Sequence, residues 1–594
     1  MFDRASTFGE ALDSPAARAV LETYLPGVAA SPMAAQFREA RLGQVAAITP
    51  ALRDDPEATE RLWAALALLE DGVDARAPYA PAVLPDPGYE DAGVPRASAE
   101  VVLPGPVPRW GAAEVVLLGP GHGNPFVDVE VTALFVGPDG RERRVGGFHD
   151  GPAPDGRGRY VLRLLAEVEG RWRFSTTSTA RSLDGLAGHV DVGPAATGTH
   201  GPVRVDGMHF AHADGTRYRP VGTTAYAWTH QPEQLVERTL ATLAEHAFTK
   251  VRMCLFPKSY LYNTEEPAAF AFPRREGAAP DATGAQGFDV TRFDVAWWRD
   301  LERRIGQLAA LGVQADLILL HPYDRWGFTD LGPAVDERYL RYAVRRLAGL
   351  ANVWWSMANE YDLLWSKTVE DWERLAAVVV EEDPHDHLLS IHNCHAFYDY
   401  SRPWVTHVSN QRVDVYRTAE EMDGWRERWG KPVVCDECAY EGDLDQGWGN
   451  VTGQELVRRC WEGAVRGGYV AHGETYLNEA EELWWSKGGE LVGSSPARMA
   501  FLDSLLAQAP DGVWDPLPSD WDVPWGGVAG RVLVGYLGFS QPRFRTVVLP
   551  EGSWRVEVID TWEMTVTPLP GLHEGAVRVD LPGRQYLAIR ATRV

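Results

Sequence analysis

Near its middle the chain reads Asn352-Val353-Trp354-Trp355-Ser356-Met357-Ala358-Asn359-Glu360-Tyr361-Asp362. The run 353–358 carries no charge, and an amide and a carboxylic acid follow it at once. An uncharged apolar run of this length is typical of a parallel strand that is buried on both faces. The pattern therefore predicts a buried strand that presents Glu360 at its carboxyl end.

A second segment repeats this pattern further along the chain, at Lys431-Pro432-Val433-Val434-Cys435-Asp436-Glu437-Cys438. In an eight-stranded β/α barrel the carboxyl ends of the strands form the catalytic face. Hydrolysis of a glycosidic bond needs two carboxylic acids on one rim, one as proton donor and the other as nucleophile or base. Glu360 and Glu437 are therefore predicted to be the catalytic residues of a glycoside hydrolase.

Residues 200–510 alternate between strand and helix patterns throughout. The strand candidates are 218–224, 249–256, 315–320, 353–358, 388–392, 405–408, 432–436 and 469–473. Amphipathic segments with a 3.6-residue repeat lie between them, at 233–245, 296–311, 337–350, 369–382 and 453–465. Eight is the number of strands that closes such a barrel, and the alternation indicates a parallel sheet with helices outside. We predict an α/β fold with a (β/α)8 TIM barrel over residues 200–510.

The chain has 594 residues, which is too long for one hydrophobic core. Residues 1–80 place apolar side chains at helical spacing and are expected to form a helical module, with a Pro- and Gly-rich linker over 76–95. Residues 97–195 and 511–594 alternate with period two between turn signals. They are expected to form an N-terminal and a C-terminal β-sandwich.

The charge balance excludes some classes of partner. With 57 basic and 83 acidic residues the net charge is −26, which opposes binding to nucleic acid or to an anionic membrane. A neutral carbohydrate fits better, and some of the 23 Trp and 20 Tyr could stack on sugar rings. The chain start has no secretion signal and no apolar run reaches membrane length, so we expect a cytoplasmic protein. Whether it forms a homo-oligomer is left open.

Residues at the carboxyl ends of barrel strands converge on one cavity even when they are far apart in the sequence. On this ground the rim is expected to include Tyr226 and Ser409-Asn410-Gln411. The predicted substrate-binding residues are Trp228, Arg252, His321, Tyr323, Asp324, Trp326, Asn359, His392, Asn393, Tyr440, Glu474 and Trp485. His321 and His392 could instead only shape the rim, and Trp485 could instead pack beneath a sandwich.

Two groups of residues have some likeness to metal sites. His385, His387, His392 and His395 are close in sequence, but their spacing spans a loop and a strand. Cys435 and Cys438 have C-x-x-C spacing but lack a second pair of ligands. We predict neither a metal nor a cofactor.

Several segments resemble a known group of proteins. They are Arg171-Trp172-Arg173-Phe174, Gly207-Met208-His209-Phe210 with the following Arg219-Pro220-Val221-Gly222-Thr223-Thr224-Ala225-Tyr226, and His321-Pro322-Tyr323-Asp324-Arg325-Trp326-Gly327-Phe328. The group combines a DUF5060-like β-sandwich, a DUF4038 or apiosidase-like barrel and a DUF5605-like C-terminal domain. Asn359-Glu360 and Glu437 also resemble the catalytic pair of the clan A retaining glycoside hydrolases, which follows barrel strands four and seven. The resemblance covers residues 97–594.

The resemblance implies that Glu360 is the acid/base and Glu437 the nucleophile. It also implies that Asn359 contacts the sugar 2-hydroxyl and that Arg252 keeps Glu437 ionised. A carboxylate separation of about 5 to 5.5 Å and retention of configuration would follow. The clan often has a His-x-Tyr pair after strand six, where this chain has Ser409-Asn410-Gln411. The hydrogen bond to the nucleophile is therefore expected from Tyr323 or Tyr440.

These expectations describe a retaining glycosidase. An exo-acting enzyme for short plant-derived oligosaccharides or glycosides is favoured, and the apiosidase-like kinship points to a pentose or furanoside. Two alternatives stay open. A transglycosidase would make sugar products longer than its substrate, whereas a carbohydrate-binding pseudoenzyme would bind oligosaccharides and cleave no aryl glycoside.

Overall fold

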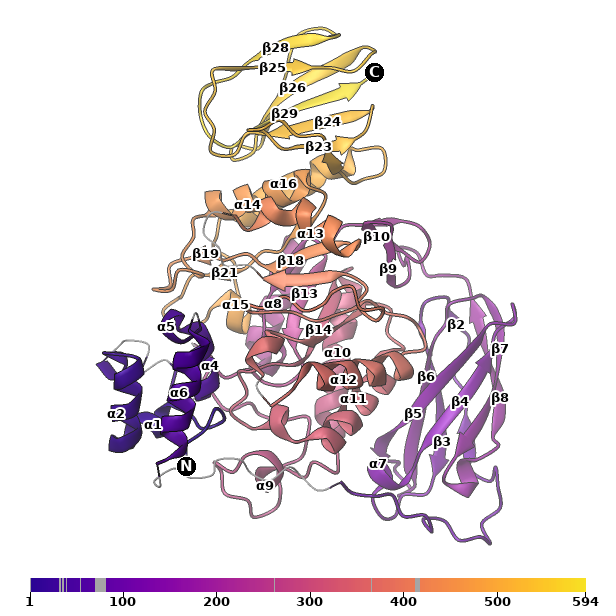
Figure 1. The fold of residues 1–594 in the computed structure, drawn as a ribbon. Helices are drawn as coiled ribbons and strands as arrows, with labels where there is room; N and C mark the ends of the chain where they lie inside the picture. Colours follow the sequence, from indigo (N-terminus) through magenta and orange to yellow (C-terminus); the bar gives the residue numbers. More distant parts are fainter. Residues whose placement is uncertain are drawn as a thin grey trace.

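The computed structural model describes residues 2–594 except 31–33, 35–36, 39, 54, 70–81, 261, 365 and 412–416. The part of the predicted linker over 76–81 lies outside the described residues. Figure 1 shows a central α/β body with a small helical module at one side, a β-rich unit at the other side and a second β-rich unit at the carboxyl end. In the part of the chain that is described, no helix is long and apolar enough to cross a membrane.

The central body contains a curled set of parallel strands in two pieces. The first piece is a five-stranded sheet of β12 (Gly222–Thr224), β13 (Lys250–Cys254), β14 (Gln314–Leu320), β15 (Val353–Ala358) and β16 (Leu389–Ser390). The second is a three-stranded sheet of β17 (Val408–Gln411), β18 (Val433–Glu437) and β20 (Tyr469–Val470). A parallel bridge between Thr223 and His472 links the last strand region to the first.

At the other junction between the two sheets, no strand ladder is formed by the residues that the structure describes. The chain after residue 405 instead runs beside β16 through single contacts: the Thr406 amide donates to the Leu389 carbonyl at 2.8 Å, and the Ser390 hydroxyl donates to the His407 carbonyl at 2.6 Å. Each of the eight predicted strand regions overlaps a parallel strand, but these strands do not form one continuous sheet.

Only the predicted strand 353–358 has the same bounds in the structure, and strands one and six show how the bounds of the others can differ. Strand one begins at Gly222, because Arg217–Tyr218 belongs to a separate antiparallel sheet and Pro220 lacks an N–H for a ladder. That sheet consists of β9 (Val203–Asp206), β10 (His209–His212) and β11 (Arg217–Tyr218). Strand six covers Val408–Gln411 and not 405–408. Its Ser, Asn and Gln are polar yet buried, so the apolar pattern did not mark them as a strand.

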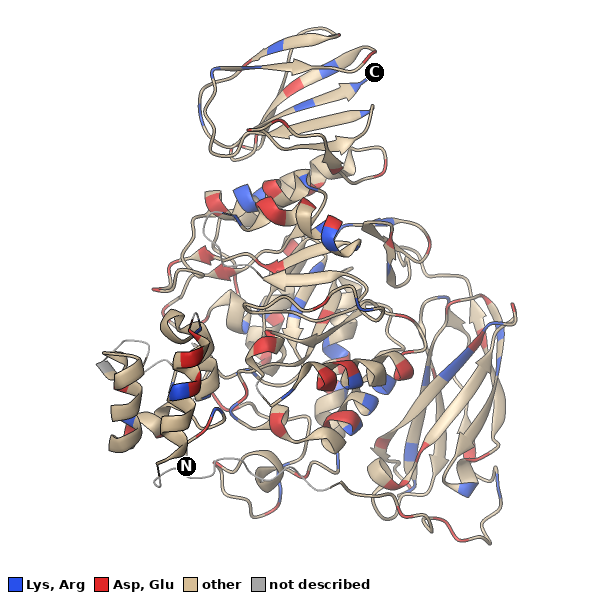
Figure 2. Ribbon diagram, viewed as in Figure 1, with Lys and Arg blue, Asp and Glu red and all other residues tan. Residues whose placement is uncertain are grey.

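The helices that cover the strands agree closely with the periodic segments. They are α8 (Glu233–Glu245), α10 (Val295–Ala310), α11 (Pro333–Leu347), α12 (Val369–Glu382) and α14 (Gly453–Val465). Each buries an apolar stripe in one large core cluster shared with the parallel strands. Figure 2 shows acidic and basic residues mixed along α11 and α12. Arg345 joins these two helices through Glu382 at 2.6 Å.

The N-terminal module consists of short helices. They are α1 (Phe8–Asp13), α2 (Pro15–Tyr24), η1 (Val28–Ala30), α4 (Leu42–Ile48), α5 (Pro50–Arg53) and α6 (Pro56–Ala67). Side-chain oxygens of Ser14 and Asp55 cap α2 and α6, each of which begins with a proline. The module encloses a hydrophobic cluster of its own, which includes Phe8, Leu21 and Leu62.

Each of the two β-rich units also has its own core. The first has the strand order β1-β3-β6-β5-β4-β7-β8-β2 between Glu100 and Gly193 and encloses the fully buried Trp172. The strands are β1 (Glu100–Val102), β2 (Val107–Pro108), β3 (Ala112–Gly119), β4 (Val131–Val136), β5 (Glu142–Pro152), β6 (Gly158–Leu165), β7 (Gly170–Ser178) and β8 (Ala187–Gly193).

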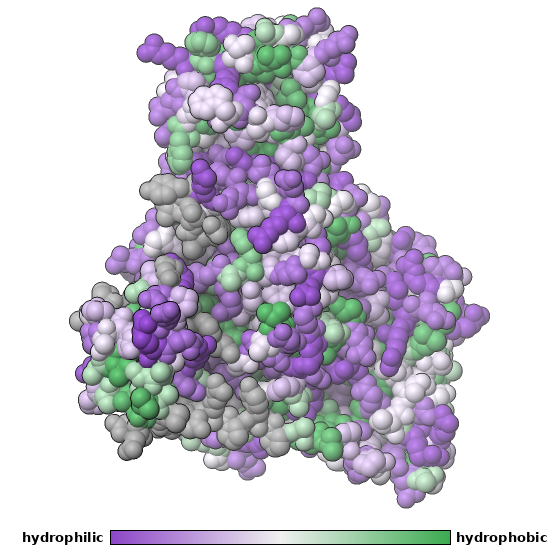
Figure 3. All heavy atoms as spheres, viewed as in Figure 1, coloured by the Kyte–Doolittle hydropathy of each residue, from purple (hydrophilic) through white to green (hydrophobic). Residues whose placement is uncertain are grey.

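The second β-rich unit has a six-stranded order, β22-β23-β24-β29-β26-β27, and a separate pair, β25 with β28. The strands are β22 (Asp515–Leu517), β23 (Trp525–Val528), β24 (Val532–Tyr536), β25 (Phe544–Val548), β26 (Trp554–Asp560), β27 (Thr565–Pro568), β28 (Ala576–Asp580) and β29 (Leu587–Arg593). Trp554 is fully buried in its core. On the face drawn in Figure 3, hydrophilic residues predominate and hydrophobic residues form separate patches.

Candidate active site

The two predicted catalytic carboxylic acids lie at strand ends on the same rim of the parallel strands. Glu360 stands two residues beyond the end of β15, and Glu437 is the last residue of β18. They are 6% and 7% exposed, so both carboxyl groups are largely shielded from water. Glu360 has a left-handed backbone (φ 50°, ψ 55°), which costs a non-glycine residue roughly 1 kcal/mol or more. Such a conformation is retained where the surrounding contacts fix the side chain.

Cationic and hydroxyl donors surround Glu437. The Arg252 guanidinium donates from Nη1 to Glu437 Oε1 at 3.1 Å, and the Tyr226 hydroxyl donates to the same oxygen. The same Nη1 lies 2.6 Å from Asn359 Oδ1, so the arginine ties the two strand ends together. His392 Nε2 is 3.9 Å from Glu437 Oε1. Glu437 therefore accepts hydrogen bonds from one cationic and one hydroxyl donor.

Glu360 has neutral hydrogen-bond donors instead. The Tyr323 hydroxyl donates to Oε2, and the Gln411 amide donates to Oε1 at 2.9 Å. Burial, with a contribution from the negative charge of Glu437, raises the pKa of Glu360 to about 7. Of the two acids, Glu360 is therefore suited to hold a proton near neutral pH.

Of the two residues expected to hydrogen-bond to Glu437, Tyr323 contacts the other acid and Tyr440 lies beside Glu437. Tyr226, which follows strand one, donates to Glu437, while Tyr323 donates to Glu360. The Tyr440 hydroxyl is buried next to the Glu437 carboxylate. Burial and then the charge of Glu437 raise the Tyr440 pKa well above its usual value, so its ring lies near the nucleophile candidate.

A buried lysine that the sequence did not indicate lies between the two acids and a group of aromatic rings. The Lys258 ammonium is 3.5 Å from the centre of the Tyr226 ring and 4.4 Å from the Tyr323 and Trp485 rings. Its side chain is almost fully buried. Burial lowers the pKa of Lys258 to about 8, which leaves most of the population charged at neutral pH. Cation–π contacts stabilise such a charge.

The aromatic rings form a wall on one side of this lysine. Tyr260 packs on Tyr323 at 4.8 Å and on Trp485 at 5.9 Å, and Trp485 packs on Tyr226 at 5.4 Å between ring centres. The Trp485 indole N–H is buried beside the Tyr440 hydroxyl. Flat rings next to two carboxylic acids are suited to hold a sugar ring.

A second charged cluster supports the strand ends from below. The Lys250 ammonium lies 2.5 Å from Asp316 and 2.6 Å from Asp436, and the Ser409 hydroxyl donates to Asp436 at 2.6 Å. Asp436 immediately precedes Glu437, at a register shift between β17 and β18. The cluster therefore joins four strands, β13, β14, β17 and β18, next to the candidate nucleophile.

Six of the predicted substrate-binding residues lie at this site. Arg252, Asn359 and His392 surround Glu437, and Tyr323, Tyr440 and Trp485 line the space around Lys258. The side chains of the other six have structural partners. Their partners are as follows: Trp228 with the Met253 sulfur, His321 with the Phe256 carbonyl, Asp324 with three backbone amides, Trp326 with Glu266, Asn393 with Tyr400 and Gln411, and Glu474 with the amides of Val492 and Gly493.

These partners show how the six side chains are held in the structure. Asp324 and Glu474 use their carboxylates to hold loop backbone, and Trp228 is fully buried in the core. The strand-end rule correctly places a residue near the rim but does not tell which way its side chain points. Tyr226 and Gln411 were on the predicted rim, whereas Lys258 and Tyr260 follow strand two in a loop with no motif.

The histidines and cysteines considered as ligands do not form a metal cluster. Within the described part of the chain, no group of three or more His, Cys, Asp or Glu side chains is arranged to hold a metal ion. His385 instead accepts a hydrogen bond from the Leu165 amide of the N-terminal β-rich unit, and His387 bonds to the Asp383 carboxylate.

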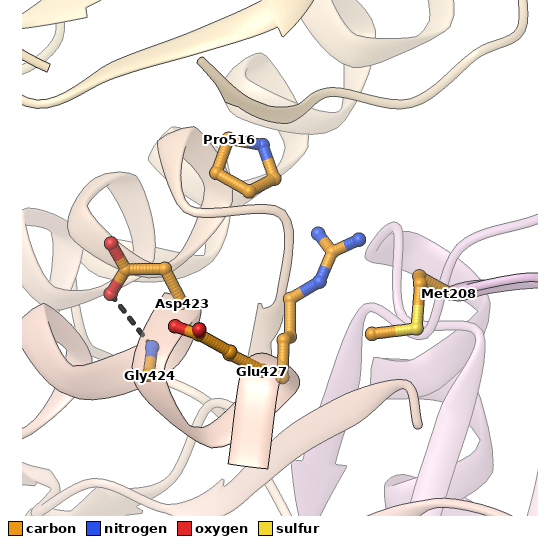
Figure 4. Close-up of a pocket in the computed structure, with 6 residues that line it drawn as sticks. Met208, Asp423, Gly424, Glu427 and Pro516 are labelled. Carbon is orange, nitrogen blue, oxygen red and sulfur yellow. Dashed lines mark hydrogen bonds between the residues drawn. The ribbon is translucent and has the colours of Figure 1, made fainter. Parts of the chain in front are cut away.

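A hollow of about 460 Å³ lies elsewhere in the molecule, between α13 (Met422–Trp429) and the start of the C-terminal unit. Its lining residues are Met208, Asp423, Gly424, Arg426, Glu427 and Pro516 (Figure 4). Arg426 is engaged with Asp515 at 2.7 Å. Neither candidate catalytic acid lines this hollow, so it is separate from the carboxylate site.

Three family models match the chain. The model described as "Apiosidase-like, catalytic domain" matches residues 205–501, which include both candidate acids. Two models described as domains of unknown function flank it, DUF5060 at residues 106–179 and DUF5605 at 521–592. A comparison with curated proteins gives no match.

Solved structures provide further similarity. A protein from Bacteroides vulgatus ATCC 8482, named as a "putative glycoside hydrolase", is 38% identical with a TM-score of 0.77 and covers 83% of this chain and 100% of its own. A family 5 glycoside hydrolase from the same organism is 14% identical with a TM-score of 0.51, covering 66% of this chain and 94% of its own. The second likeness is one of fold alone.

Proposed function

Because this chain belongs to the glycoside hydrolases with an apiosidase-like catalytic domain, we propose that it cleaves glycosides by double displacement with retention. Glu437 is the nucleophile and Glu360 is the general acid/base. The observation that carries this assignment is the contrast between the two acids: Arg252 contacts Glu437, whereas burial raises the pKa of Glu360 to about 7. Two carboxylic acids in such different environments suit two different roles.

The eight parallel strands function together as a (β/α)8 barrel in this proposal. The bridge between Thr223 and His472 and the contacts of Thr406 with Leu389 support this, because they lie at the two junctions between the sheets. Closure brings the ends of β15 and β18 to one mouth. The carboxyl groups of Glu360 and Glu437 must then be about 5 to 5.5 Å apart for a retaining mechanism.

In the first step, Glu360 gives its proton to the leaving oxygen while Glu437 attacks the anomeric carbon. The bond from carbon to the leaving group breaks and a covalent glycosyl-enzyme forms. In the second step, Glu360 takes a proton from water, which attacks the same carbon and releases Glu437. Asn359 is held by Arg252 beside the nucleophile and is placed to contact the sugar 2-hydroxyl.

The proposed substrates are short, plant-derived oligosaccharides or glycosides attacked at an end, and a pentose or furanoside is favoured. The tyrosine and tryptophan rings around Lys258 support a small sugar ring as the bound unit. The ammonium can donate hydrogen bonds to sugar hydroxyls without changing its aromatic neighbours.

A panel of nitrophenyl glycosides with proton NMR of the first-formed sugar tests this proposal. Release of nitrophenol with an initial product of the same anomeric configuration is expected. An initial product of opposite configuration would overturn the double displacement. Products longer than the substrate would identify a transglycosidase, and binding of oligosaccharides without any release would identify a pseudoenzyme.

The hydrogen bond between Tyr323 and Glu360 leads to a prediction about pH. The tyrosine donates to the carboxylate and so lowers the Glu360 pKa, against the effect of burial. Tyr323→Phe should therefore raise that pKa. The alkaline limb of kcat/KM, where the acid loses its proton, should move to higher pH by about 1 unit, which corresponds to about 1.4 kcal/mol.

Tyr398→Phe is a matched control, because Tyr398 is a buried tyrosine whose hydroxyl donates to Glu373 and not to either candidate acid. Its pH profile should coincide with that of the unmodified enzyme. An alkaline limb that moves to lower pH in Tyr323→Phe, or does not move, would contradict the assigned hydrogen bond.

A further inference from the structure

The N-terminal helical module is outside all three matched family models, the first of which begins at residue 106. It nevertheless lies on the side of the central body toward which the parallel strands carry their carboxyl ends (Figure 1). Side chains of the module reach the loops that form the candidate site. They include Phe37, Arg41 and Gln44.

Gln44 joins the loops that hold Tyr323 and Glu360. Its amide nitrogen lies 3.2 Å from the Pro322 carbonyl and 3.4 Å from the Leu363 carbonyl, while its amide oxygen accepts from the Arg41 backbone at 2.7 Å. The side chain is 8% exposed. A buried amide with partners at both ends has one preferred orientation. Pro322 immediately precedes Tyr323, so one module side chain fixes the backbone beside the acid/base and beside its hydrogen-bond donor.

Phe37 and Arg41 make further contacts between the module and the loops of the candidate site. The Phe37 ring lies 6.3 Å from the ring of Tyr260, edge to face, and Tyr260 packs on both Tyr323 and Trp485. Arg41 pairs with Asp330 at 3.0 Å. The aromatic wall of the site therefore continues from Trp485 through Tyr260 to the module without interruption.

We propose that the N-terminal helical module forms one wall of the substrate site and limits how far a bound sugar chain can extend past Tyr260. In this role Phe37 is a specificity-determining residue, and Gln44 is a positioning residue that acts through the loops of Tyr323 and Glu360. The inference rests on the proposed function, and it supplies the reason for end-specific cleavage: a cleft with one end covered accepts only a chain end.

The first test measures docking without any substrate. In Gln44→Ala, hydrogen–deuterium exchange should rise in the segments around Pro322 and around Leu363 while exchange in the module core stays unchanged. Gln44→Glu is a second variant of equal size, and it places a carboxylate against two carbonyl oxygens. Arg61→Ala is the control, because Arg61 is an exposed residue of the same module that pairs with Asp55 and Glu57. If hydrogen–deuterium exchange at both loops is unchanged in both Gln44 variants, Gln44 does not hold the loops of Pro322 and Leu363.

The second test measures chain-length selectivity. For the sugar that the enzyme cleaves best, kcat/KM is compared between the nitrophenyl monosaccharide and the nitrophenyl trisaccharide. Phe37→Ala should raise the trisaccharide-to-monosaccharide ratio about tenfold by removing a steric block, whereas Arg61→Ala should leave it unchanged. Phe37→Leu, which keeps apolar bulk in the module core, should give a smaller rise.

The outcomes separate this inference from the proposed function. If the trisaccharide-to-monosaccharide ratio of kcat/KM does not change in either Phe37 variant, the module does not limit the sugar chain, even if every glycoside is hydrolysed as proposed. If the unmodified protein hydrolyses no glycoside, the proposed function fails, and the exchange measurement alone still decides whether the module holds the two site loops.

Discussion

Glu437→Gln is expected to lower kcat by at least about 10⁴-fold on every aryl glycoside, or about 5.5 kcal/mol of transition-state stabilisation. Gln has the size of Glu but cannot attack the anomeric carbon, so no glycosyl-enzyme forms. The loss should be independent of the leaving group, because the missing nucleophile is needed before any leaving group can depart by this route. Rates with nitrophenyl and with less acidic aryl glycosides check this expectation.

Glu474→Gln is the matched control for this variant. Glu474 is also a buried glutamate near a strand end, and burial raises its pKa to about 7, but it accepts hydrogen bonds from the Val492 and Gly493 amides. Its replacement should lower the thermal midpoint of unfolding and leave most of kcat intact. A Glu437→Gln enzyme with nearly full activity, or a Glu474→Gln enzyme that fails as completely, would require another nucleophile.

The smaller Glu437→Ala variant adds a stereochemical test. Removing the carboxylate leaves space beside Arg252 and Tyr226, which azide can enter. Azide attacks from the side of the missing nucleophile, so the glycosyl azide should have inverted configuration. A product of retained configuration would mean that Glu437 is not on the attacking side.

The sequence was sufficient to place both acids because each follows a short apolar strand. That signal depends only on local pattern, and the same is true of α8, α12 and α14, whose predicted and observed bounds are identical. The three matched models also confirm the suspected family. Local periodicity and motif position were therefore adequate wherever one face of an element is uniformly apolar.

Prediction from the sequence was less successful where the buried side chains are polar. Ser409, Asn410 and Gln411 lie inside a strand, since Ser409 bonds to Asp436 and Gln411 to Glu360, and no hydrophobic pattern reveals such pairs. The direction of a side chain at a strand end is also a tertiary property. Asp324 turns back onto backbone amides, whereas Tyr323 beside it reaches Glu360.

Lys258 shows a further limit of prediction from sequence. A lysine in a loop after strand two is ordinarily solvated, and only the packing of Tyr226, Tyr323 and Trp485 around its ammonium places it in the site. The contacts of Gln44 with two distant loops are similar, because each joins residues about 300 positions apart. Contacts of that separation leave no periodic signal in the chain.

Glu360→Ala is expected to produce a loss that depends on the leaving group. The acid protonates the departing oxygen, so its removal should lower kcat/KM by roughly 10²- to 10⁴-fold for poor leaving groups and much less for dinitrophenolate, which needs no proton. The plot of log kcat/KM against leaving-group pKa should become steeper. Parallel plots for Glu360→Ala and the unmodified enzyme would contradict the acid role.

The pH profile and azide give two independent checks of the same residue. Burial raises the Glu360 pKa to about 7, so the unmodified enzyme should lose activity as pH rises through that value, and Glu360→Ala should lack this alkaline limb. With a good leaving group the variant should accumulate the glycosyl-enzyme, because no base activates water for the second step. Azide needs no base, so it should accelerate turnover and give a glycosyl azide of retained configuration, opposite to that from Glu437→Ala. The same configuration from both variants would show that the two acids do not act on opposite faces of the sugar.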